Sequence, residues 1–294
     1  MAHKREDKSI KERSRGCSCL TECFESSPMS IHVNVVSLLS NSFVECFLKC
    51  SECCKDIGYV SEFSRLASER LMEAYKCNDD VKRLLENIKK YVDELQRAAE
   101  QVFSSVLRYE VELESRLTVH GSSHHLPLQI SLAWDPVLNV PYVPSSSIRG
   151  VVRAFFEENI QGGKVSGSIE DLVKLFGETE HSSVVVFFDV YPVECRGDHL
   201  VEADVITPHY SEVAGTIDEA RSSPVPLVFP VLAPRTVLHV LVALRKPVDG
   251  STLKTFMGGV SKALESGLGA KTSVGYGRVR VKKVYFPQLN HRYE

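Results

Sequence analysis

The sequence contains no long apolar run. Its two longest apolar stretches are residues 184–190 and the proline-interrupted run 225–233, and both are far shorter than the roughly 20 residues that a helix needs to cross a bilayer. Residues 1–8 are largely charged and no apolar segment follows them, so the pattern of a secretory signal is missing. We therefore expect a cytoplasmic protein that makes no membrane contact.

The chain as a whole also lacks an excess of charge of one sign. Its 294 residues carry a net charge of −3, which alone gives no reason to expect a polyanionic partner. Residues 235–294, however, contain eleven Lys or Arg and three acidic residues, a net +8, so the remaining residues carry −11. A basic segment on an acidic protein is typical of a nucleic-acid partner, and a solvated charged face is the alternative.

The nine cysteines are odd in number and unevenly clustered. With no secretory signal, this argues against a disulfide framework and predicts that most of the cysteines are reduced thiols. The clusters 17–23 and 46–54 could give a tetrahedral zinc site, but a row of small buried side chains on one helix, beside Phe43 and Phe47, is the alternative. We predict no cofactor and no metal, and the candidate ligands for zinc are Cys46, Cys50 and Cys53.

Composition and periodicity divide the chain into three parts. Residues 1–30 are polar and of mixed charge, which predicts a mobile arm. Residues 31–106 have helical periodicity, clearest at 81–106, where apolar side chains recur at alternating four- and three-residue spacing. Residues 78–80 (Asn-Asp-Asp) supply an N-cap before this stripe. The stripe predicts core packing, and packing on a partner helix is the alternative.

Residues 107–294 are predicted to form a domain of mixed α and β structure. Period-two alternation and β-branched runs indicate strands, and capped 3.6-residue patterns indicate helices. The order strand, helix, strand, strand, helix, strand predicts an α+β, ferredoxin-like (RRM-like) domain, with residues 195–230 inserted between the middle strands. The strands are expected at 109–119, 184–190, 237–244 and 278–286, and the helices at 147–159, 169–176 and 251–266.

The most informative segment is the glycine-rich loop 267–277, which has the form G-x-G, five residues, G-x-G. Glycine permits positive φ and lets a ligand approach the backbone closely. Exposed main-chain amides and basic side chains would bind phosphates, and a tyrosine ring would allow a base to stack. A purely structural entry into a strand is the alternative. The glycines are Gly267, Gly269, Gly275 and Gly277, and the predicted nucleic-acid contacts are Lys271, Thr272, Tyr276 and Arg278.

A nucleotide-binding P-loop is excluded as an interpretation of this loop. Ala270 stands where a P-loop needs the glycine before its lysine, and the required earlier glycine is missing. A P-loop also leads from a strand into a helix, whereas this loop leads from a predicted helix into a predicted strand.

A second candidate RNA contact lies at the start of the first predicted helix of this domain. Ser145, Ser146 and Ser147 would cap the helix, and the free amides of a helix N-terminus favour phosphate. Arg149 and Arg153 are four residues apart, so both would lie on one helical face. A capped helix with surface arginines is the alternative.

Together these stretches resemble the RAMP superfamily of CRISPR proteins. The loop 267–277 is similar to the glycine-rich loop of that family, and residues 141–153 are similar to the entry to the first helix in RAMPs of effector complexes. Residues 204–210 and 224–230 are similar to elements of the sixth Cmr subunit of type III-B effectors. The resemblance covers about residues 107–286 and leaves the helical region unmatched.

The resemblance implies a non-catalytic, structural RNA-binding subunit in antiviral defence. Such a subunit lies at one end of a hetero-oligomeric complex with other Cmr subunits, binds CRISPR guide RNA toward its 3′ portion and faces the target RNA. Residues 195–230 would include the thumb that lies beside the guide–target duplex. The sequence departs from the family at Ser145, where a glycine is common and where serine tolerates positive φ less well.

Catalysis is the alternative to this reading. His120, His124 and His125 follow the first strand, where metal-independent RAMP ribonucleases often carry a catalytic histidine that can act as a general base. Asp135 lies where backbone RAMPs of type III complexes carry a cutting aspartate, although its Trp-Asp-Pro setting does not match that pattern. We predict no catalytic residue. If the chain does cut RNA, the candidate residues are Asp135, His124 and His125. The rival functions are a stand-alone RAMP endoribonuclease that processes guide precursors and a protein-interaction adaptor.

Overall fold

The structure, a computed structural model, describes residues 18–25, 29–50, 58–119, 126–162, 175–177, 182–207, 211–213, 216–218 and 226–286. These residues form two compact units. The first unit takes its described residues from those before 77, from 126–132 and from 201–231, and the second takes the rest. Within the described ranges, no helix is long and apolar enough to span a bilayer.

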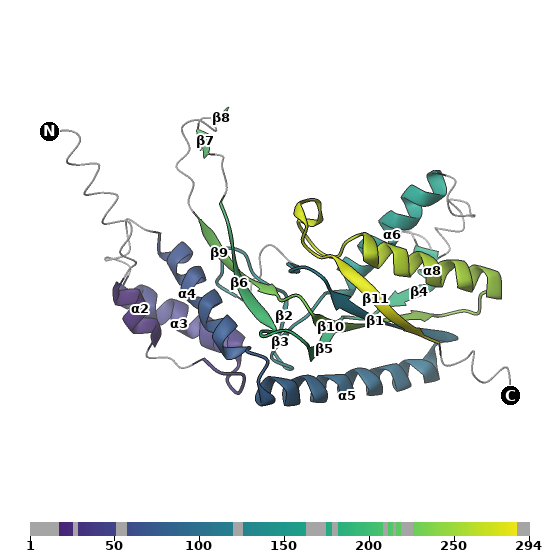
Figure 1. Cartoon of the computed structure of the whole chain (residues 1–294), viewed down its shortest axis with the longest axis horizontal. Helices are drawn as coiled ribbons and strands as arrows, with labels where there is room; N and C mark the ends of the chain where they lie inside the picture. The colour runs from purple at the N-terminus through teal and green to yellow at the C-terminus, as the bar shows by residue number, and fades with distance from the viewer. Residues whose placement is uncertain are drawn as a thin grey trace. The chain divides into compact units, whose positions relative to one another are not determined.

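An antiparallel five-stranded sheet forms the centre of the second unit (Figure 1). The central strand β10 is buried along its whole length, whereas β1 alternates between buried and half-buried residues. The strands predicted at 237–244 and 278–286 are confirmed, but the strand expected at 109–119 starts earlier and ends at Leu113. Neighbouring strands follow the order β11 (Val279–Tyr285), β1 (Ser105–Leu113), β10 (Thr236–Leu244) and β4 (Val185–Phe187), and β5 (Tyr191–Cys195) also pairs with β10.

Two helices of the second unit, α6 (Ser145–Gln161) and α8 (Gly250–Ser266), pack on each other. Phe156 of α6 stacks on Phe256 of α8 with ring centroids 5.8 Å apart. A Cβ atom at Gly259 would collide with the Phe156 ring, so glycine permits this close approach. The hydroxyl of Tyr109 in β1 donates to the Met257 carbonyl of α8 at 3.3 Å. Both helices were predicted, while most of the helix expected at 169–176 lies outside the described residues.

The long helix α5 (Asp79–Val102) also belongs to the second unit and packs against β5. The Asn78 side chain accepts from the Val81 amide at 3.0 Å, which confirms the predicted N-cap. The predicted stripe packs into the core, but the helix ends at Val102, whose side chain is exposed, and Val106 lies in β1. The buried residues of the stripe are Val81, Leu85, Ile88, Val92 and Ala99.

In its described residues, the first unit combines three helices with short strands. Residues 18–25, which we expected in a mobile arm, form a helix because Leu20 and Phe24 are buried and the Phe24 ring meets Phe63 edge-on at 5.2 Å. The domain boundaries proposed at residues 30 and 106 stay a prediction. The elements are α2 (Ser18–Glu25), α3 (Val35–Cys50), α4 (Tyr59–Ala74), the paired strands β6 (Val201–Ile206) and β9 (Leu227–Leu232), and the paired strands β7 (Ser211–Val213) and β8 (Thr216–Asp218).

Two disulfides between described residues contradict the prediction of reduced thiols at four of the cysteines. Cys23 pairs with Cys46 and Cys77 pairs with Cys195, with Cα atoms 5.8 and 6.0 Å apart, separations that suit a disulfide. Cys50 is a buried free thiol. The prediction used only the number of cysteines and their spacing along the chain. The bonded partners are 23 and 118 residues apart, so only the fold brings them together.

Candidate nucleic-acid interface

The glycine-rich loop 267–277 connects the end of α8 to the start of β11 (Figure 1). Its chain direction, out of a helix and into a strand, is the one that excluded a P-loop. All four glycines have positive φ, with values of 134° at Gly267, 80° at Gly269, 96° at Gly275 and 66° at Gly277. The prediction that this loop needs glycine for its backbone conformation is therefore confirmed.

The base of the loop is fixed to the chain segment that follows β1. The Gly277 amide donates to the Arg116 carbonyl at 2.7 Å, and the Ala270 amide donates to the Thr118 carbonyl at 2.9 Å. A Cβ at Gly277 would collide with the Leu268 carbonyl, and one at Gly269 would lie only 2.5 Å from the Thr118 oxygen. These two glycines therefore have a packing role as well as a conformational one.

The amides near the tip of the loop bond within the loop itself. The Val274 and Tyr276 amides donate to the Lys271 carbonyl at 3.1 and 3.2 Å, and the Gly275 amide donates to the Thr272 carbonyl at 3.1 Å. Successive exposed amides, which we expected to bind phosphate, are therefore not offered at these positions. The reason is a short 3-10 turn (Thr272–Val274), which closes its own hydrogen bonds. Anion binding here would depend on side chains.

The tip of the loop presents exposed side chains. Lys271, Thr272 and Val274 are exposed, and 71% of the Val274 surface is accessible. A Cβ at Gly275 would meet no atom within 4 Å, so the backbone there is open to a ligand. Tyr276 is half-buried. The tip thus combines a cation, a hydroxyl and an accessible backbone position.

The positive charge of β11 is partly neutralised by acidic residues in β1 and directly after it. Arg280 pairs with Glu114 at 2.5 Å and Lys282 pairs with Glu112 at 3.4 Å. Burial acts to raise the pKa of Glu112, but hydrogen bonds from Lys282 and Arg196 together hold it below its ordinary value. The net +8 of the C-terminal segment therefore overstates the positive potential around this strand. Lys271 of the loop and Arg278, which directly follows the loop, are exposed.

The N-terminus of α6 differs from the predicted one. Pro144 is the N-cap residue, and no serine side chain caps the helix. The Ser145 amide donates to a carboxylate oxygen of Asp189 at 2.7 Å, and the Ser147 amide donates to the Pro144 carbonyl at 2.9 Å. The protein therefore supplies its own anion where we expected phosphate, because the fold brings Asp189 to this end of the helix. Ser146 is exposed.

The two arginines of α6 have partners inside the protein. Arg149 donates to the Phe176 carbonyl at 2.5 Å, and Arg153 forms an ion pair with Glu157 at 2.8 Å. The pairing with Glu157 is solvent-exposed and can be exchanged for a phosphate at low cost. Arg149 is exposed and keeps its full charge, because a carbonyl is a neutral acceptor, whereas Arg153 would have to exchange Glu157 for the phosphate.

Asp135 accepts hydrogen bonds at a turn between two short strands. It ends the short strand β2 (Trp134–Asp135), which pairs with β3 (Val140–Pro141). One carboxylate oxygen accepts from the Val137 and Leu138 amides at 2.8 and 2.9 Å, and the other accepts from the Tyr191 hydroxyl at 2.8 Å. Burial first, and then this hydrogen bond, raises the pKa of Tyr191. Through these hydrogen bonds, the Asp135 side chain closes the turn that follows β2.

The remaining catalytic and metal candidates are not assembled into a site by the described residues. His120, His124, His125 and Cys53 lie outside those residues. Cys46 is bonded to Cys23, so its sulfur is not a thiolate ligand, and the Cys50 thiol donates to the Cys19 carbonyl at 3.1 Å. Among described residues, no group of three His, Cys, Asp or Glu side chains could hold a metal ion.

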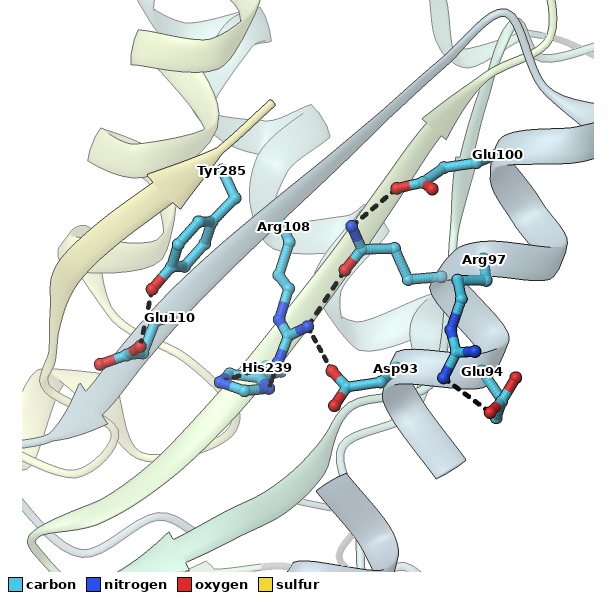
Figure 2. A network of polar contacts seen from close by, with 9 residues as sticks. Asp93, Glu94, Arg97, Glu100, Arg108, Glu110, His239 and Tyr285 are labelled. Carbon is cyan, nitrogen blue, oxygen red and sulfur yellow. Dashed lines mark hydrogen bonds and ion pairs between the residues drawn. The ribbon is translucent and has the colours of Figure 1, made fainter. Parts of the chain in front are cut away.

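A polar network on the sheet was not predicted (Figure 2). Arg108 of β1 donates to Asp93 and Gln96 of α5 at 2.6 and 3.1 Å and also contacts His239 of β10. The one signal in the sequence was His239, a lone imidazole in the otherwise apolar run 237–244. Its partners come from α5 and β1, so periodicity could not have identified them.

Comparisons with known proteins point to one family. The family model of the RAMP superfamily matches residues 111–280. The chain is 29% identical over 201 residues to CRISPR system CMR subunit Cmr6 of Saccharolobus solfataricus, which covers 68% of the chain and 66% of that relative. It is 32% identical over 124 residues to Cmr6 of Pyrococcus furiosus, covering 40% of the chain and 36% of the relative. The chain thus matches less than two thirds of the length of either.

A solved structure extends this likeness. It is the cryo-EM structure of the type III-B Cmr-beta bound to cognate target RNA, one chain of which is 25% identical to the present chain. The match has a TM-score of 0.68 and covers 86% of this chain and 92% of that one.

Proposed function

Because the chain belongs to the RAMP superfamily, we propose that it is a non-catalytic, RNA-binding subunit of a type III-B CRISPR effector complex, of the kind called Cmr6. The observation that carries the proposal is the likeness of most of the chain to a subunit of a Cmr complex bound to target RNA. The two curated relatives support the same assignment. The partners are guide RNA, target RNA and other Cmr subunits, and the complex acts in the cytoplasm.

Phosphate contacts by the loop 267–277 are the proposed mode of RNA binding. Lys271 of the loop and Arg278, directly after it, are exposed, and hydrogen bonds fix the base of the loop, so the backbone that carries them needs little ordering when RNA binds. The open position at Gly275 lets a ribose-phosphate backbone come close. Thr272 would donate to a phosphate, and Tyr276 would lie against a base.

Contacts by α6 form a second, weaker part of this interface. Ser146, Ser147 and Arg153 lie in its first half, and Arg149 is held by the Phe176 carbonyl. Asp189 reduces the attraction of this helix end for phosphate. RNA affinity is therefore expected to depend more on the loop than on α6.

We also infer the ferredoxin-like arrangement for residues 107–286. The order β11-β1-β10-β4, with α6 after β1 and α8 after β10, supports it. The strands β6 to β9 fall within residues 195–230 or next to them, so this segment is the candidate thumb beside the guide–target duplex.

Absence of catalysis is part of the proposal. Both carboxylate oxygens of Asp135 accept hydrogen bonds from the chain, which leaves it poorly placed as a base or a metal ligand. Specific cleavage of RNA by the purified chain alone would instead favour the stand-alone endoribonuclease.

Affinity purification of the tagged chain from its own cells, followed by sequencing of the co-purified RNA, tests the proposal. We expect the other Cmr subunits and CRISPR guide RNAs to co-elute in fixed ratio. A chain that elutes alone, or with proteins but no RNA, would contradict the assignment and favour the adaptor function.

A further inference from the structure

A cavity of about 580 Å³ opens where α5 meets the sheet of the second unit. This volume lies in the range of small-ligand sites, about 300–1,000 Å³. The residues that matter for its chemistry are Lys89 of α5, Arg108 and Glu110 of β1, His239 of β10, and Tyr285 and Phe286 at the end of β11. The loop 267–277 contributes none of the lining.

One part of the cavity is held rigidly by Arg108. Its guanidinium donates to Asp93 at 2.6 Å and to the Gln96 side chain at 3.1 Å, and it contacts the His239 ring (Figure 2). Only 13% of the Arg108 side chain is exposed. The charges of Arg108 and Asp93 cancel in this ion pair, so neither is available to a ligand as a full charge.

His239 adds a neutral ring to the same wall. Burial, and then the charge of Arg108, lowers its pKa to about 3, so the imidazole is uncharged near neutral pH. An uncharged imidazole can accept the hydrogen bond from Arg108. The Arg108 guanidinium and the His239 ring therefore form a flat, rigid wall, to which the histidine adds no charge.

Two charges of opposite sign remain at the opening. Lys89 is exposed. Glu110 receives one long hydrogen bond, 3.5 Å from the Tyr285 hydroxyl (Figure 2), so its carboxylate keeps capacity to accept further bonds. Tyr285, with 42% of its surface exposed, and Phe286 add aromatic surface.

A matching ligand must present adjacent hydrogen-bond donors to Glu110, a flat ring to the aromatic residues and an anion to Lys89. Among RNA bases, guanine offers two neighbouring donors, N1–H and N2–H, that fit the two oxygens of one carboxylate. Unpaired RNA bases are commonly held by stacking and by contacts to this base edge. An arginine from a protein partner would satisfy Glu110 but would meet the positive charge of Lys89.

We propose that this cavity binds one unpaired guanine nucleotide of RNA, with the base on Glu110, its ring beside Tyr285 and Phe286, and its phosphate near Lys89. The proposed function enters this inference only by making RNA the source of the nucleotide. The cavity itself shares no residue with the loop 267–277. It adds a position that recognises a base edge to an interface whose other contacts go to the RNA backbone and to the face of a base.

Binding of the four ribonucleoside monophosphates to the full-length chain tests the site, measured by calorimetry or saturation-transfer NMR. GMP is expected to bind saturably at millimolar concentration and more tightly than AMP, CMP and UMP. Glu110→Gln is expected to weaken GMP binding about tenfold and to remove the preference for guanine. Gln keeps the volume of Glu, and a thermal melt checks that the variant is folded.

Glu112→Gln is the matched control, because Glu112 is two residues further along the same strand and is absent from the cavity lining; this variant is expected to bind GMP as the wild type does. The site is overturned by equal binding of all four nucleotides, by no GMP binding, or by an unchanged GMP affinity in Glu110→Gln. Stronger binding of arginine amide than of GMP would also overturn it, in favour of a protein partner. Lys271→Ala with Arg278→Ala is expected to leave GMP binding intact, which separates failure of this site from failure of the loop.

Discussion

The carboxylate of Asp189 accepts a hydrogen bond from the Ser145 amide at 2.7 Å. An acidic side chain at the first turn stabilises a helix through its dipole and satisfies an amide that has no partner within the helix. The same carboxylate repels an approaching phosphate. One contact therefore favours folding of α6 and opposes the binding of a phosphate there.

Asp189→Asn is expected to separate these two effects. The amide oxygen of Asn can still accept from Ser145, so the free energy of unfolding should fall by only about 0.3–1 kcal/mol. RNA affinity should rise a few-fold, measured by filter binding at fixed salt, because the repulsion is gone. Glu158→Gln removes a charge near the other end of α6 and should leave RNA affinity unchanged. If both variants bind RNA as the wild type does, the α6 N-terminus does not contact RNA.

Lys271→Ala combined with Arg278→Ala should weaken RNA binding and flatten its salt dependence. Each lost contact to a single-stranded phosphate lowers the slope of log affinity against log salt by about 0.7, so the pair should lower it by about 1.4. Lys254→Ala with Lys262→Ala removes the same charge from exposed positions of α8 and serves as the control. An unchanged slope in the loop variant would contradict the assignment of Lys271 and Arg278.

Gly277→Ala and Gly275→Ala should differ in stability although both glycines have positive φ. A methyl group at 277 would collide with the Leu268 carbonyl, whereas one at 275 enters open space. Urea unfolding should show a loss of about 1 kcal/mol for Gly275→Ala, from backbone strain alone, and about 3 kcal/mol or more for Gly277→Ala. Equal losses would mean that the base of the loop is not packed as described.

Asp135→Ala should leave RNA cleavage by the assembled complex unchanged. The substitution removes the acceptor for the Val137 and Leu138 amides, so stability should fall by about 1 kcal/mol. Asp135→Asn keeps an acceptor and should be milder. Loss of cleavage at one or more target sites in a properly assembled complex would assign a catalytic role to Asp135.

His239 should make stability depend on pH. Its pKa is lowered from 6.5 to about 3 in the folded chain. Between pH 3 and pH 6.5, His239 therefore binds a proton in the unfolded state but not in the folded state. The contribution is complete above about 6.5 and is lost as the pH falls toward 3, at up to about 1.4 kcal/mol per pH unit. Urea unfolding between pH 4 and 7, in which His239→Gln is compared with the wild type, should give a shallower curve for the variant. Parallel curves would rule out this role.

The elements that the sequence predicted are those whose signals are local. The apolar run 237–244 became the central strand, and the glycines of loop 267–277 took the φ values that only glycine adopts easily. The features that were missed depend on residues far apart in the chain. Asp189 reaches Ser145 across 44 residues, and Arg108 reaches His239 across 131. The charge count failed in part for the same reason, since Glu112 and Glu114 lie opposite β11 but outside the segment counted.

The disulfide between Cys77 and Cys195 closes a covalent ring of chain that contains all of α5, β1 and α6. A protease that cuts once anywhere inside this ring would leave both fragments joined. They would run as one species on a non-reducing gel and separate only after a reductant is added. After such a cut, α5 and the strands β1, β4 and β5 would therefore stay covalently connected through the disulfide.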